Sequence, residues 1–120
     1  MDPNSFYFTV KMPGDTRLIG IVRDLATQAA SYAKLPAEVA EQLSHRVGVA
    51  TESAIESLYE RNAPVKFRFE GDADALEVTV SCEVEPASVP PTSTLGGDLT
   101  VAWSRDGSRQ TCLIRQRRPA

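Results

Sequence analysis

Three glutamates in the middle of the chain have a spacing that could support chemistry. Glu52, Glu56 and Glu60 follow one another at four-residue steps, which places them on one side of an α-helix. Neighbouring carboxylates can bind a divalent cation, and a single carboxylate can act as a general base. A helix with a solvated outer face carries the same pattern. Three interpretations therefore stay open: a solvated face, an acidic surface for a partner, and a metal or catalytic site.

Other reactive residue types form no catalytic or metal-binding set. His45 is the single histidine, and no Ser-His-Asp or Cys-His arrangement can be assembled around it. Cys82 and Cys112 stand in apolar runs without the spacing of a zinc site or a CxxC motif, so we expect buried, reduced thiols. Trp103 is expected to pack in the core or on the sheet.

Composition narrows the class of protein. The chain has 120 residues, 42% of them hydrophobic and 24% charged, which fits one globular domain over residues 1–120. A net charge of -3 gives no general attraction to nucleic acid, although Arg115–Arg118 is a local basic patch. The sequence has no secretory segment and no apolar run of membrane-spanning length. We expect a cytoplasmic protein with no membrane partner.

The pattern of apolar residues predicts one strand, two helices and then four strands. Residues alternate in polarity from Phe6 to Met12, as in a half-buried strand. A first helix is expected from a cap at Asp15 or Thr16 to about Lys34, with an apolar side that includes Ile21 and Tyr32. A second helix is expected from Pro36 to about Asn62. Alternating runs then predict strands near 65–69, 76–84, 99–103 and 110–114.

Two amphipathic helices can bury their apolar sides on one face of a sheet. The sequence therefore predicts an α+β two-layer sandwich, with a mostly antiparallel (mixed) sheet and both long helices on one face. The last two strands flank Asp106-Gly107, a strong hairpin signal. Residues 85–98 are rich in Pro, Gly and Ser/Thr and are expected to form a loop.

This order of elements resembles the GHKL (Bergerat) ATP-binding domain, and its size is similar to that of bacterial anti-sigma-factor serine kinases. The resemblance rests on Ile21–Leu25, on Ala50–Ala54 and on the closing hairpin from Leu99 to Arg115. In that family a helical Glu activates water or the acceptor hydroxyl, and an Asn four residues later binds Mg²⁺. Glu52 matches the Glu, whereas Glu56 stands in the place of the Asn.

The other family motifs are altered. The strand that should lead into Asp-x-Gly-x-Gly reads Ser81–Pro86, where Glu83 or Glu85 could imitate the Asp that reads adenine. Loop 85–98 takes the place of the ATP lid, and Gly96-Gly97 is a weak remnant of the glycine-rich box. Together these changes indicate a scaffold that has lost its nucleotide.

The resemblance therefore leads to a non-catalytic regulatory module of anti-sigma-factor-like type. We expect it to bind a protein partner or a second copy through Glu52, Glu56 and Glu60, with no cofactor and no metal. The alternative is a divergent serine kinase that uses ATP and Mg²⁺, with Glu52 as general base and with Glu56 and Glu83 at the cofactor. A third possibility is a subunit whose nucleotide pocket is completed by its partner.

Overall fold

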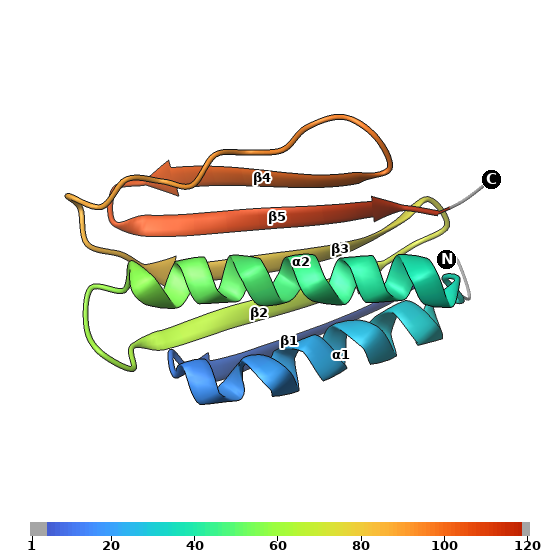
Figure 1. Cartoon of the computed structure of the whole chain (residues 1–120), viewed down its shortest axis with the longest axis horizontal. Coiled ribbons are helices and arrows are strands. Elements are labelled where there is room, and N and C mark those ends of the chain that lie inside the picture. Colours follow the sequence, from blue (N-terminus) through green and yellow to red (C-terminus); the bar gives the residue numbers. More distant parts are fainter. Residues whose placement is uncertain (1–4, 119–120) are drawn as a thin grey trace.

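The computed structural model describes residues 5–118, which form two layers (Figure 1). One layer is a five-stranded sheet and the other is a pair of helices on one of its faces. This confirms the predicted α+β two-layer class. In chain order the elements are β1 (Phe6–Pro13), the 3-10 turn η1 (Thr16–Leu18), α1 (Ile19–Tyr32), α2 (Ala37–Glu56), β2 (Pro64–Gly71), β3 (Ala75–Glu83), β4 (Leu99–Asp106) and β5 (Arg109–Arg117).

The sheet has the strand order β1-β2-β3-β5-β4. Each of its four neighbouring pairs is antiparallel, so the described sheet has no parallel pair. Short turns close both hairpins. Asp72 Oδ1 accepts the amides of Asp74 at 2.7 Å and Ala75 at 2.9 Å before β3, and Gly107 takes a φ of 62° between β4 and β5. The predicted hairpin is confirmed, but its turn is shifted by one residue to Gly107-Ser108, because Asp106 still belongs to β4 and pairs with Arg109.

Strand alternation decides which side chains form the core. In β2, Phe67 and Phe69 are buried while Lys66 and Arg68 are exposed on the opposite face. Directly opposed residues share a face, so the helix-facing core continues across the strands through Phe69↔Val78 and Val78↔Ile114. The helices cover this face. The other face of the sheet is open, and we call it the open face.

Small residues let the two helices approach closely. Ala40, Ser44 and Gly48 are buried at four-residue steps on α2. A Cβ added at Gly48 would lie 2.8 Å from Arg23 Cδ of α1. The hydroxyl of Ser44 donates to the Arg23 carbonyl at 3.1 Å. A larger side chain at position 48 would therefore have to displace Arg23.

The first helix differs from its prediction on one side. Asp15 caps the segment as expected, with its side chain accepting the Arg17 amide. Ile21 and Tyr32, expected on the apolar face, are 50% and 66% exposed. The reason is the position of β1 at the edge of the sheet, which leaves no further strand for that side of α1 to cover.

The second helix ends at Glu56, so its predicted continuation to Asn62 is wrong. The backbone after Glu56 pairs with the end of β3 instead. Leu58 forms an antiparallel bridge with Val84. The Tyr59 amide donates to the Glu83 carbonyl at 3.0 Å, and the Glu85 amide donates to the Ser57 carbonyl at 2.9 Å. These tertiary hydrogen bonds replace further helical ones.

Replacing Phe67 with Ala should lower the free energy of unfolding by about 3–5 kcal/mol, because the ring is 1% exposed and its removal leaves a cavity. The neighbouring Lys66→Ala on the open face is the control and should change it by less than about 0.5 kcal/mol. Urea unfolding followed by circular dichroism measures both. Equal losses in the two variants would contradict the assignment of faces.

Candidate functional site

Glu52 and Glu56 lie on the exposed side of α2. The residues between and beside them that face inward are Ala50, Thr51 and Ala54, which are all buried. The Thr51 hydroxyl donates to the Val47 carbonyl at 2.7 Å within the helix. The two glutamates therefore share the outer face of the helix layer, as their spacing predicts, and they point away from the sheet.

Glu60 does not continue their stripe. It follows the end of α2 and lies in a turn. There it lines a hollow of about 240 Å³ between the start of α1 and the start of β2. Asp15, Arg61 and Asn62 line the same hollow. The predicted three-residue helical stripe is wrong at this position because α2 stops one turn too early.

Glu83 belongs to the opposite side of the molecule. Its neighbour Cys82 faces the helices and is buried, so Glu83 projects from the open face. Its carboxylate accepts the Ser108 hydroxyl and lies 3.2 Å from Arg109 Nη2. Glu52 and Glu56 instead project from the outer side of α2, although the backbone that follows Glu56 pairs with Glu83 and Val84. The three residues assigned to a nucleotide in the kinase alternative are therefore not brought together.

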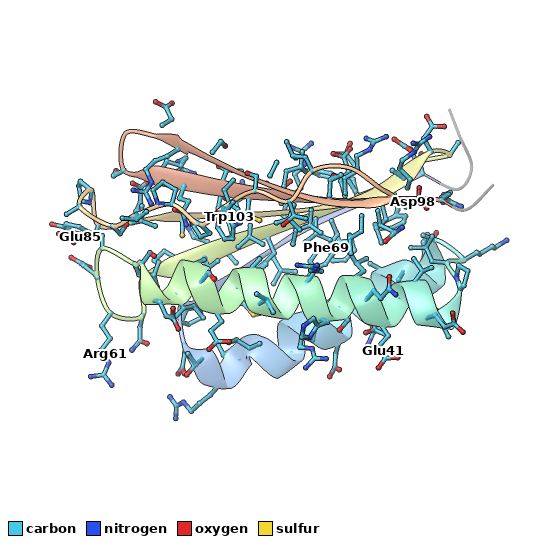
Figure 2. The ribbon with its side chains drawn as sticks, turned by 45° about the horizontal axis from the view of Figure 1, so that its top comes forward. Glu41, Arg61, Phe69, Glu85, Asp98 and Trp103 are labelled. Atoms are coloured by element: carbon cyan, nitrogen blue, oxygen red, sulfur yellow. The ribbon has the colours of Figure 1, made fainter. Side chains whose placement is uncertain are left out.

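The segment that takes the place of an ATP lid, residues 85–98, runs along the outer edge of β4. Thr94 and Val101 exchange two backbone hydrogen bonds, at 2.7 and 2.8 Å. The hydroxyl oxygen of Ser93 accepts the Trp103 amide at 2.9 Å. Glu85 and Asp98 mark the two ends of this segment and lie at opposite ends of the sheet (Figure 2). Its backbone bonds hold it along the strand.

A buried polar cluster fixes the start of the same segment. Arg105 donates to the Ser88 carbonyl at 2.6 Å and to the Gln110 amide oxygen at 2.6 Å. Gln110 is 1% exposed and faces the helix side of β5. Among the described residues, Arg105 Nε and Gln110 Nε2 are buried without a hydrogen-bond partner. The cluster explains why the loop begins by folding onto β4.

The outer surface of the helix pair has two adjoining hollows. One, of about 590 Å³, lies between α1 and α2 and is floored by Ala40 and Ser44. The other, of about 880 Å³, extends across α2 to Leu99. Arg23 and Glu41 line both, and Figure 2 shows Glu41 on this side of the molecule. The remaining ionisable lining residues are Asp24, Glu38, His45 and Arg46.

These hollows were not predicted from the sequence. The sequence does carry one signal, the small residues Ala40, Ser44 and Gly48 at four-residue steps. Small residues at this spacing indicate a helix surface that a second helix can approach closely, and the hollows lie along that contact. Arg23 gives no such signal, since an isolated arginine on a helix is usually solvated. Its placement over Gly48 depends on the tertiary packing of α1 against α2.

No nucleophile or metal centre stands out in the described chain. Residues 5–118 contain no group of three or more His, Cys, Asp or Glu side chains that could hold a metal ion. No helix within the same range is long and apolar enough to cross a membrane. At the basic end of the chain, Arg115 pairs with Glu77 at 3.5 Å and the Arg118 amide donates to the Asp74 carbonyl at 2.9 Å. Neither arginine lies beside Glu52.

No protein-family model and no curated protein matches the sequence. The resemblance to GHKL domains therefore stays a prediction from Ile21–Leu25, Ala50–Ala54 and the closing hairpin.

The two thiols should be unreactive in the folded protein. Both cysteines are free and buried, and burial raises the pKa of Cys82 to about 11 and that of Cys112 to about 12. Because the thiolate is the reacting form, titration with Ellman's reagent at pH 8 should label neither thiol in buffer and both in urea. Rapid labelling of either in the folded protein would contradict this assignment.

Proposed function

We propose that the chain is a non-catalytic regulatory module that binds a protein partner through the outer face of α1 and α2, in the manner of an anti-sigma factor. One observation carries the proposal: the residues that a nucleotide site would need lie on separate surfaces. Glu52 and Glu56 are exposed on α2, Glu83 projects from the open face, and residues 85–98 are bonded along β4.

The charge of the helix layer indicates the chemistry of the partner. Five carboxylates stand on α1 and α2 against two arginines, and all seven residues are exposed. The partner that fits is a protein segment rich in Lys and Arg, because opposite charge speeds encounter and selects partners. The acidic residues are Asp24, Glu38, Glu41, Glu52 and Glu56.

The hollows give this surface a shape that a partner can enter. The hollow of about 590 Å³ between the helices has small residues at its floor, and charged residues stand around it. Arg23 and Glu41 connect it to the wider hollow across α2. A basic side chain of the partner can lie against Glu41 while its backbone follows the groove. Glu52 and Glu56 continue the acidic surface toward the end of α2.

Partner capture with charge-reversed variants tests this proposal. Immobilised protein should retain a partner from a lysate of its source organism, and Glu52→Lys/Glu56→Lys should lose it. The matched control is Glu77→Lys/Asp106→Lys, which makes the same change of charge on the open face and should retain the partner. We expect at least a tenfold loss of binding for the first variant, which corresponds to about 1.4 kcal/mol.

Two results would contradict the proposed surface. One is equal retention of the partner by both charge-reversed variants. The other is loss of the partner only with the open-face control. Circular dichroism of each variant confirms that the comparison is made between folded proteins.

A further inference from the structure

The cover that α1 and α2 give to the helix-facing side of the sheet ends before β4. Packed helices lie about 8–10 Å apart and strands about 4.8 Å apart, so one helix covers two strands. α1 lies over β1 and β2, where Val22 lines a small void with Met12 and Val65. α2 packs on β3 and β5. Figure 1 shows no helix of the described residues in front of β4.

The floor of this uncovered strip is apolar. Val101 of β4 is directly opposed to the buried Ile114 of β5, so it projects from the helix-facing side. Leu99 and Trp103 stand two residues to either side of Val101 and share its side. Both are only partly buried, and Figure 2 shows Trp103 between β4 and α2. Apolar surface therefore remains open on this strand.

Two walls turn the strip into a trough. One wall is the side of α2 that faces β4, where Val49 is 47% exposed. The other wall is residues 91–94, which backbone hydrogen bonds hold beside β4 like a short sixth strand. A hollow of about 130 Å³ lies between the walls. We call the space between residues 46–53, residues 91–94 and residues 101–103 the β4 trough.

We propose that the β4 trough binds an amphipathic α-helix of a partner protein, with its apolar side toward Val49 and Trp103 and a carboxylate beside Arg46. A helix fits because β4 and residues 91–94 together give the two-strand width that α1 and α2 each cover elsewhere on the sheet. A β-strand is excluded, since Thr94 already occupies the outer edge of β4 at Val101. Helices that bind apolar grooves place their anchors at i, i+3 or i+4, and i+7.

Arg46 selects the sign of the charge on the docked helix. Among the described residues that line the hollow beside residues 91–94, it is the one charged residue. It is exposed on α2, and no ion pair of the described residues involves it. A Glu or Asp of the docked helix can pair with its guanidinium, whereas a Lys or Arg there would be repelled.

This inference does not rest on the proposed function. The proposed partner carries a basic segment and depends on Glu52 and Glu56, whereas the β4 trough takes an apolar helix with an acidic residue and depends on Arg46. Variants at the two places therefore test the two proposals separately.

Selection from a surface-displayed library of amphipathic helices tests the occupant. The library helices have Leu, Ile, Val or Phe at groove-binding spacing, random residues elsewhere and no Trp. Helices enriched on the folded chain should carry Asp or Glu beside the apolar stripe. The chain has a single Trp, so a selected peptide in the β4 trough should shift the fluorescence of Trp103 to shorter wavelength as the indole leaves water.

Charge exchange tests the role of Arg46. Arg46→Glu should weaken the best selected peptide at least tenfold, and replacing the acidic residue of the peptide with Lys should restore part of the loss. The matched control is Arg61→Glu, which makes the same change of charge at an exposed position in the turn after α2. The control should leave the affinity nearly unchanged, and circular dichroism checks that both variants fold.

Four results would overturn the inference. The first is a library from which no helix is enriched on the folded chain. The second is a selected peptide that Arg46→Glu and Arg61→Glu weaken equally. The third is a peptide that leaves Trp103 fluorescence unchanged and is lost with Glu52→Lys/Glu56→Lys, which would support the proposed function instead. The last is a native dimer that Arg46→Glu dissociates, which would assign the trough to a second copy of the chain.

Discussion

Burial of a single face of the sheet is the constraint on which the rest of the structure depends. Phe67, Phe69, Val78, Val80 and Ile114 point to the same side, and α1 and α2 cover that side. Every polar side chain that cannot enter this core must lie on the open face or on the outer face of the helices. The same rule that builds the core therefore places the side chain of Glu83 on the open face and those of Glu52 and Glu56 on the outer side of α2.

A second constraint is that each edge strand of the sheet has backbone groups on its outer side without a neighbouring strand. The chain returns from β3 to β4 through residues 85–98, and the hydrogen bonds of Ser93 and Thr94 attach this return to β4. A segment bonded in this way protects an edge, and its residues Pro91 and Thr92 also line a small hollow with Val49 of α2. The opposite edge, β1, receives no such cover from the described residues. The two edge strands therefore differ: β4 is covered by the chain's own segment, and β1 is not covered by any described segment.

Local periodicity was enough to predict most of the fold. Alternation from Phe6 to Met12 and the hairpin signal at Asp106-Gly107 each depend on neighbours in sequence. The strand and the hairpin are confirmed, with the turn shifted by one residue to Gly107-Ser108. The end of α2 could not be predicted in this way, since the bridge from Leu58 to Val84 joins distant segments. The exposure of Tyr32 likewise depends on which strand lies at the edge of the sheet.

The candidate site was less predictable than the fold. Helical spacing correctly placed Glu52 and Glu56 on one outer face, but it could not tell that Glu83 lies behind the sheet. That position depends on strand register, which Cys82 and Gln110 fix by pairing inside the core. The hollow around Arg23 arises from contact between two helices. No pattern within one helix reveals the residues that the other contributes.

Isothermal titration calorimetry of the purified, folded chain with ATP and ADP, with and without Mg²⁺, tests the central claim most directly. Because Glu52, Glu56 and Glu83 lie on separate surfaces, the account predicts no heat of binding up to about millimolar nucleotide, the weak limit of specific recognition. Micromolar binding that requires Mg²⁺ and is lost in Glu52→Ala would contradict it and would restore the kinase alternative.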